Sequence, residues 1–136
     1  LGHLAACAQV LRMTPWRMLL AEGMHEMPRG ADLVTDADDP ALRVIACSGA
    51  PRCGEAYADT RALASTLARH IPADARLHVS GCAKGCAHSG SADITLVATR
   101  DGFDLIRHGT ARDVPVMRGL TGSDLVANPS LLSGAH

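Results

Sequence analysis

Four of the five cysteines in this 136-residue chain fall into two tight pairs set among glycines. The pairs are Cys47 with Cys53, five residues between them, and Cys82 with Cys86, three residues between them. Four thiolates can hold a metal centre, and such a centre can stabilise a fold with a small apolar core. The chain has a single Trp, Tyr and Phe, so its core is expected to be thin. The fifth cysteine, Cys7, lies among alanines and leucines and is predicted to be a buried small hydrophobe.

The spacing within the pairs favours an iron–sulfur cluster. The irons of a 4Fe–4S cluster lie at separate corners, and four cysteine thiolates complete their coordination. Structural zinc usually takes cysteines with two to four residues between them, which suits the second pair better than the first. Two structural disulfides are a further alternative, which the flanking glycines and the lack of a secretory pattern oppose. We therefore predict that Cys47, Cys53, Cys82 and Cys86 ligate a 4Fe–4S cluster, with zinc as the main rival.

The residues around the pairs are also expected to favour thiolates. Glycine lets backbone N–H groups approach sulfur closely, which tunes the reduction potential of a cluster. Cys53 is predicted to lie at the start of a helix over 55–70, where the helix dipole favours a thiolate. Arg52 and Lys84 lie beside ligands, and they either offset negative charge or are ordinary surface cations. The glycines concerned are Gly49, Gly54, Gly81 and Gly85.

Charge and hydropathy argue against several classes of function. The net charge is −1, and no basic stripe or aromatic stacking set suggests nucleic-acid binding. No apolar run approaches the length that spans a bilayer, so no membrane partner is predicted. No signal peptide is visible, and we expect a cytoplasmic protein. Because Leu1 is not a start methionine, we expect a fragment or a processed product.

Hydrophobic periodicity and turn residues predict an α+β fold. Helices are predicted over 1–9 and over 55–70, where apolar residues share one face. Asp101-Gly102 predicts a tight hairpin, which makes the last two predicted strands antiparallel. After Gly109 the periodicity fades, and either a short helix over 123–127 or a loose tail is expected. Strands are predicted over 10–14, 16–21, 42–46, 77–80, 94–99 and 103–108.

At these motifs the chain resembles the nitrite/sulfite reductase superfamily and, within it, the precorrin-3B synthases. The resemblance rests on segments 46–53, 60–64 and 77–88, and the sequence VSGCAKGCAH in the last of them is its most specific part. Upstream, RMTPWR over 12–17 resembles the strand motif that opens the family's second half-repeat. Siroheme-dependent reductases more typically carry proline and asparagine within the second pair, where this chain has alanine and Lys84.

The resemblance implies a nitrite/sulfite reductase-like cluster-binding domain with part of a ferredoxin-like half-domain. Residues 1–40 would end the half-repeat, 41–109 would bind the 4Fe–4S cluster, and 110–136 would form a C-terminal tail. It further implies an oxidoreductase of cobalamin synthesis, a monooxygenase that converts precorrin-3A to precorrin-3B with molecular oxygen. Electrons derived from NADH would pass through the cluster.

The same resemblance implies partners and further site residues. The partners would be the tetrapyrrole precorrin-3A, an electron donor and a missing N-terminal half of the protein. Arg12 and Lys84 are predicted to be cofactor-binding residues. Arg12 could pair with a tetrapyrrole carboxylate, which a guanidinium group suits, and Lys84 lies beside the cluster ligands; Arg17 is more readily a surface cation. In the reductases the last cysteine of the second pair, here Cys86, bridges the cluster and siroheme, a group that precorrin-3B synthase is not expected to use.

Two histidines near the second pair are assigned plainer roles, and no catalytic residue is predicted. His88 either donates a hydrogen bond near the cluster or is a plain loop histidine, and His78, within a predicted strand, is taken as structural. Two alternatives to the main assignment stay open: a fragment of a siroheme-dependent nitrite or sulfite reductase, and an inactive truncated module that binds a cluster or zinc.

Overall fold

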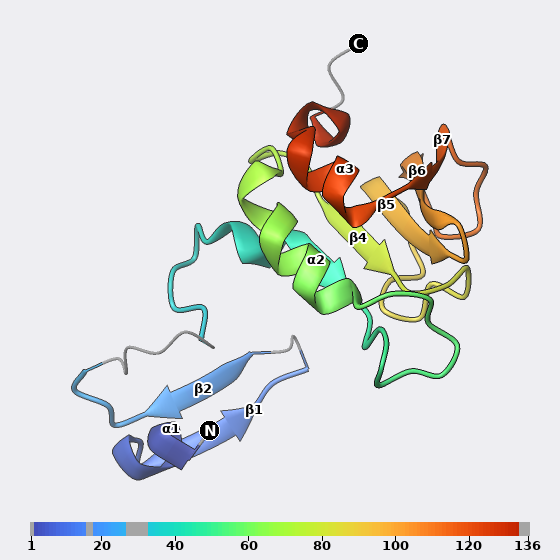
Figure 1. Cartoon of the computed structure of the whole chain (residues 1–136). Helices are drawn as coiled ribbons and strands as arrows, with labels where there is room; N and C mark the ends of the chain where they lie inside the picture. Colours follow the sequence, from blue (N-terminus) through green and yellow to red (C-terminus); the bar gives the residue numbers. More distant parts are fainter. Residues whose placement is uncertain (1, 16–17, 27–32, 134–136) are drawn as a thin grey trace. The chain divides into compact units, whose positions relative to one another are not determined.

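The chain folds into two compact units, Leu1–Asp36 and Ala37–His136, which are described separately (Figure 1). A computed structural model describes residues 2–15, 18–26 and 33–133. The described part is mixed α/β, compatible with the predicted α+β class. Within it, no helix has the length and apolar character needed to cross a membrane.

The N-terminal unit is a short helix followed by a two-stranded antiparallel ribbon. The helix α1 spans Gly2–Cys7, and the strands β1 (Val10–Met13) and β2 (Leu19–Glu22) pair along their length. These elements confirm the predicted helix and first strand, and the second strand begins later than predicted. Trp16 and Arg17, with which that strand was predicted to begin, lie outside the described residues, as does Leu1.

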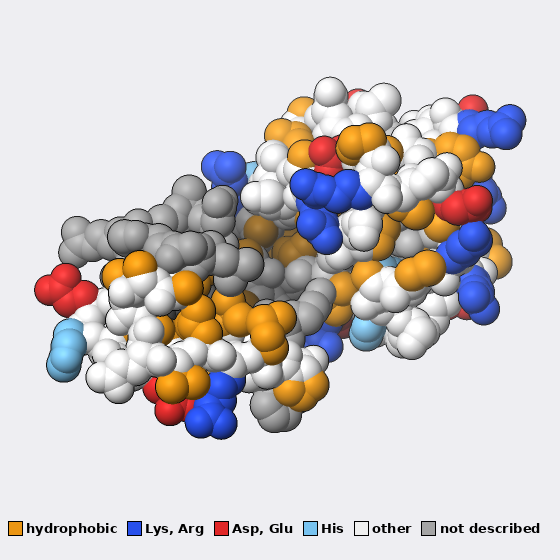
Figure 2. Space-filling view, turned by 90° about the horizontal axis from the view of Figure 1, so that it is seen from below, with side chains coloured by type: hydrophobic (Ala, Val, Ile, Leu, Met, Phe, Trp, Pro, Cys, Tyr) orange, Lys and Arg blue, Asp and Glu red, His pale blue; other side chains and the backbone are white. Residues whose placement is uncertain are grey.

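The prediction that Cys7 is buried is wrong, because its side chain is exposed. The helix has six residues and ends at Cys7, and the buried apolar residue in it is Leu4, one turn earlier. Apolar side chains also reach the surface of the ribbon, and Figure 2 shows hydrophobic groups on this unit. A two-stranded ribbon alone has little core, so most of the buried apolar surface lies in the other unit. The exposed apolar residues here include Val10, Met13, Met18 and Leu20.

The described residues of the C-terminal unit form a five-stranded mixed sheet whose order in space follows the sequence (Figure 1). The first three strands are parallel, and the last two pair antiparallel with their predecessors. The predicted hairpin at Asp101-Gly102 is confirmed, and Gly102 adopts a φ of 126° that glycine tolerates. The strands are β3 (Val44–Ala46), β4 (Leu77–Ser80), β5 (Ala92–Thr99), β6 (Gly102–Gly109) and β7 (Met117–Leu120).

The strand predicted from residue 42 is shorter than expected. A 3₁₀ helix, η1, occupies Pro40–Arg43 and precedes β3. Proline cannot donate to a sheet but suits the first turn of a helix, and the carboxylate of Asp39 accepts the N–H of Ala41 there. These residues therefore turn into the strand instead of extending it.

The helix predicted over 55–70 begins later than expected. The helix α2 spans Thr60–Leu67 and continues as a 3₁₀ turn, η2, over Ala68–His70. Asp59 caps it, because its side chain accepts a hydrogen bond from the N–H of Ala62. Cys53 therefore lies in a loop well before the helix, and the prediction that the helix dipole favours its thiolate is wrong.

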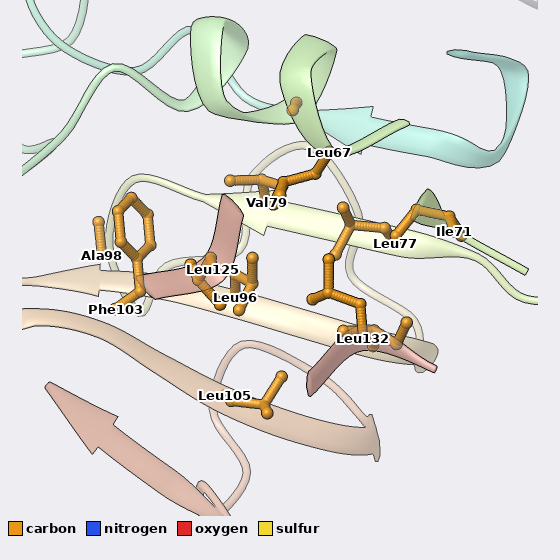
Figure 3. Packing of buried hydrophobic residues seen from close by; sticks show 12 residues of the cluster. Leu67, Ile71, Leu77, Val79, Leu96, Ala98, Phe103, Leu105, Leu125 and Leu132 are labelled. Atoms are coloured by element: carbon orange, nitrogen blue, oxygen red, sulfur yellow. The ribbon is translucent and has the colours of Figure 1, made fainter. Parts of the chain in front are cut away.

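The core lies on one face of the sheet, beneath α2 and the C-terminal segment (Figure 3). Leu77 and Val79 of β4 point toward Leu67 of α2, and their neighbours in β5 and β6 extend the cluster. The C-terminal segment adds Leu125 and Leu132, which are fully buried. A smaller apolar group lies on the other face and consists of Val97, Ile106 and Ala111.

The described residues after Gly109 include regular elements that pack against the sheet. β7 pairs with β6, and α3 (Gly122–Ala127) follows a capping box in which Thr121 and Asp124 exchange hydrogen bonds. A last 3₁₀ turn, η3, spans Pro129–Leu132. The short helix predicted over 123–127 is confirmed, whereas β7 was not predicted.

Removing the cap of α2 is expected to cost about 1 kcal/mol of unfolding free energy in the Asp59→Ala variant, since the Ala62 N–H loses its acceptor. Urea unfolding followed by circular dichroism measures this. Arg61→Ala, at an exposed position of the same helix, is the matched control and is expected to change the free energy by less than about 0.5 kcal/mol. Equal losses in both variants would contradict the assigned cap.

Candidate functional site

The loops that carry the two cysteine pairs leave the sheet from the same edge. Cys47 directly follows β3, and Cys82 follows β4 after Gly81. β3 and β4 are parallel neighbours, with Ala46 opposite Val79. Both strands therefore end at the same edge of the sheet. The prediction that each pair follows a strand is confirmed. No disulfide links the cysteines of the described residues.

The sulfur of Cys47 accepts a hydrogen bond from the second loop. The Gly81 N–H donates to Cys47 Sγ over 3.1 Å. The buried Thr60 hydroxyl donates to the Cys47 carbonyl over 2.9 Å and lies 3.7 Å from Sγ. A backbone N–H directed at Sγ is a contact that ligand sulfurs of iron–sulfur clusters accept. The expected approach of glycine N–H groups to sulfur is thereby confirmed at Gly81.

Gly81 also leaves no room for a side chain. A Cβ at this position would lie 2.6 Å from the Ala56 Cβ and 3.3 Å from Cys47 Sγ. The two cysteine loops therefore approach each other through a backbone without a side chain. The Tyr57 N–H donates to the Gly81 carbonyl over 2.9 Å, which fixes the first loop to the second.

Adding a methyl group at this contact is expected to destabilise the chain. In Gly81→Ala the new Cβ must displace Ala56, with an expected loss of about 1–3 kcal/mol of unfolding free energy. Gly54→Ala, in the first loop, is the control, since a Cβ there meets nothing within 4 Å. Chemical denaturation of both variants measures the difference, and similar stability for the two would contradict this packing.

An ion pair joins the two loops at their surface. The Lys84 Nζ lies 3.1 Å from a carboxylate oxygen of Glu55, and both side chains are more than half exposed. The hydrogen bond and charge of Glu55 raise the pKa of Lys84, with smaller contributions from the thiolates of Cys82 and Cys86. The pair is too exposed to add much stability, but it keeps a cation beside the second pair.

The second loop rests on the side of β4 that faces away from α2. Ser80 Oγ donates to the Cys82 carbonyl over 2.7 Å. His78, two residues earlier, is fully buried, and its ring lies edge-on to that of His88, with 5.7 Å between centroids. Burial, followed by the charge of His88, lowers the pKa of His78 from 6.5 to about 4. His78 is therefore neutral near pH 7.

The donor set of the candidate site consists of thiols. Among the described residues, no three His, Cys, Asp or Glu side chains are placed to hold one metal ion. Four thiols in two loops, one already accepting an N–H bond, are nevertheless suitable donors for iron. Cys47, Cys53 and Cys82 are half-buried, and Cys86 is exposed.

The other predicted site residues lie in simpler surroundings. Arg12, in the N-terminal unit, donates from Nε to Glu22 over 2.7 Å, and its predicted contact with a tetrapyrrole stays a prediction. Arg17 lies outside the described residues, and Arg52 is exposed in the first loop. The Nε2 of His88 lies 3.2 Å from the Ser91 carbonyl.

Sequence reasoning did not foresee the contacts that organise the loops. Thr60 lies 13 residues from Cys47, and Glu55 lies 29 residues from Lys84, so no local pattern marks these two contacts. The contact of Ser80 is local, since its hydroxyl donates to the carbonyl of Cys82 two residues later. His78 was taken as structural, and its full burial beside the ring of His88 was not foreseen.

Comparison with known proteins finds a partial match. A curated precorrin-3B synthase from Sinorhizobium sp is 33% identical over an alignment of 81 residues that covers 57% of this chain. The chain spans only 18% of that relative's length. No protein-family model matches the chain.

Proposed function

We propose that this chain is the cluster-binding part of an oxidoreductase of cobalamin synthesis that acts as a precorrin-3B synthase. Cys47, Cys53, Cys82 and Cys86 would hold a 4Fe–4S cluster in a nitrite/sulfite reductase-like fold. The observation that carries the proposal is the placement of both cysteine pairs at one edge of β3 and β4, with the Gly81 N–H directed at Cys47 Sγ. The partial similarity to a precorrin-3B synthase supports the same reading.

A cluster suits this arrangement better than zinc does. Zinc binds its cysteines at about 2.3 Å around one point, which requires side chains that converge. In a 4Fe–4S cluster each thiolate binds a different iron, so the sulfurs can stay further apart. The five residues between Cys47 and Cys53 exceed the spacing usual for structural zinc and therefore favour a cluster.

The chain's own residues would hold and tune the bound group. A bound cluster supplies single-electron transfer. Gly81 donates a hydrogen bond to a ligand sulfur, and Lys84 places a positive charge beside the second pair. Both stabilise negative charge at the thiolates. In the proposed reaction the electrons for the oxygenation of precorrin-3A would derive from NADH. Arg12, in the N-terminal unit, would be available to pair with a carboxylate of the tetrapyrrole.

An oxygenation assay tests the proposed function. The chain is loaded with iron and sulfide without air, then given precorrin-3A, NADH, an electron-transfer protein and oxygen, and the tetrapyrrole product is analysed by mass spectrometry. The expected product carries one additional oxygen atom and forms with the wild-type chain but not with Cys82→Ser. Reduction of sulfite or nitrite, with sharp tetrapyrrole bands in the spectrum, would instead indicate a siroheme reductase. A loaded chain that does not turn over would indicate a cluster-binding module that is inactive by itself.

A further inference from the structure

The imidazole of His78 is buried beneath the second cysteine loop without a hydrogen-bond partner. Its exposure is 0%, and neither Nδ1 nor Nε2 has a hydrogen-bond partner among the residues that the structure describes. An unpaired buried polar group costs about 1–3 kcal/mol, which an apolar side chain in this strand would avoid. The two flanking residues, Leu77 and Val79, are apolar and belong to the main core. The histidine thus requires an explanation other than stability.

Strand geometry directs His78 toward the loop and away from the helical layer. Alternate residues of a strand point to opposite faces, so His78 and Ser80 share the face opposite Leu77 and Val79. Ser80 donates to the Cys82 carbonyl, which places the start of the loop over that face. The chain returns from β4 to the parallel strand β5 through this loop, and its middle therefore crosses over His78.

The nitrogen-bearing edge of the ring faces the stretch between the two cysteines. The Cε1 atom, which separates the two ring nitrogens, lies 4.0 Å from the position that a Cβ on Gly85 would take. Gly85 directly precedes Cys86, has a φ of 64° and carries no side chain that could separate the ring from the loop. The same Cβ position lies 3.1 Å from the Ala111 Cβ, so an apolar side chain also packs against Gly85.

We propose that His78 is a positioning residue whose imidazole N–H donates a hydrogen bond to the sulfur-containing group held by Cys82 and Cys86. This inference rests on the proposed function, since it assigns a partner that a bound cluster brings. The low pKa of His78 supports it, because a neutral ring has one N–H to donate and adds no charge. His88 is less suited to this role, since its Nε2 already faces the Ser91 carbonyl.

Pulsed electron paramagnetic resonance of the reduced, iron-loaded chain tests the hydrogen bond directly. The protein carries histidine labelled with ¹⁵N in the ring, so that backbone nitrogens do not interfere. The wild-type chain is expected to show a ring-nitrogen coupling to the cluster that disappears in His78→Leu and persists in His88→Gln. The midpoint potential of the cluster is expected to fall in His78→Leu, because hydrogen bonds to sulfur stabilise the reduced state, and to recover in part in His78→Gln.

Thermal unfolding of the metal-free variants separates this role from a structural one. His78→Leu is expected to unfold at the same or a higher temperature than the wild-type chain, because it removes an unpaired polar group. If the loaded wild-type chain shows no histidine coupling and has the same midpoint potential as His78→Leu, the inference is overturned while the proposed function stands. A water molecule as partner of the ring would give this result. Coupling lost in His88→Gln but kept in His78→Leu would also overturn it. A wild-type chain that takes up no iron would overturn the proposed function as well.

Discussion

The substitution Cys82→Ser is expected to reduce the iron bound after anaerobic loading from about four atoms per chain to near zero. A serine hydroxyl is a poor substitute for a soft thiolate, and three remaining cysteines leave one corner of a cluster without its ligand. The same loss is expected for Cys47→Ser, Cys53→Ser and Cys86→Ser. Iron and acid-labile sulfide, measured on the same desalted samples, provide the test.

Cys7→Ser is the matched control for these variants. Cys7 is exposed and lies in the N-terminal unit, apart from both cysteine loops in sequence, so iron and sulfide are expected to stay at wild-type levels. Near-wild-type iron content in any one of the four loop variants would show that this cysteine is not a ligand. Retention of zinc in place of iron by the wild-type chain would favour the zinc module.

A second large effect is expected when the metal-free chain is acidified from pH 6.5 to pH 4. The pKa of His78 is about 4 in the folded chain and 6.5 in its ordinary state, so the unfolded chain binds the additional proton in this window. Stability is therefore lost as the pH falls and is fully present above about pH 6.5. Since one pKa unit corresponds to about 1.4 kcal/mol, the loss of unfolding free energy that protonation of His78 causes over this window is expected to be about 3 kcal/mol.

His78→Leu isolates this contribution. The variant lacks the titrating ring, so the difference in unfolding free energy between wild type and variant is expected to change by about 3 kcal/mol between pH 7 and pH 4. Hydrogen bonds from Thr110 and Thr121 lower the pKa values of Asp113 and Asp124. The stabilisation that these two carboxylates contribute to the fold is therefore lost only at lower pH. Urea denaturation at a series of pH values measures the curves. Parallel curves for the two proteins would contradict the buried, neutral state of His78.

Local patterns predicted those elements of the fold that local residues determine. The strand over 77–80 is reproduced residue for residue, because apolar Leu77 and Val79 alternate with polar His78 and Ser80, as is typical of a strand. The hairpin at Asp101-Gly102 depends on a glycine conformation that the dipeptide signals directly. β7 was not predicted because it is an exposed edge strand without an apolar pattern, and its pairing with β6 is a tertiary contact.

The same limit applies to the candidate site. The sequence predicted that each cysteine pair lies in a loop after a strand. The structure brings both loops to one edge of the sheet. The errors at Cys7 and Cys53 arose where a helix ends or begins, since Asp59, a cap that sequence reasoning passed over, moves the start of α2 away from Cys53. The contacts of Thr60 and His78 join segments that are distant in the sequence, and only the folded chain reveals them.

The visible absorption spectrum of the wild-type chain, purified without air and recorded before and after dithionite, tests the central claim most directly. A 4Fe–4S cluster on the four cysteines predicts a broad brown absorption that bleaches on reduction and shows no sharp macrocycle bands. A colourless protein with tightly bound zinc would contradict the cluster and, with it, the proposed route of electrons through this chain.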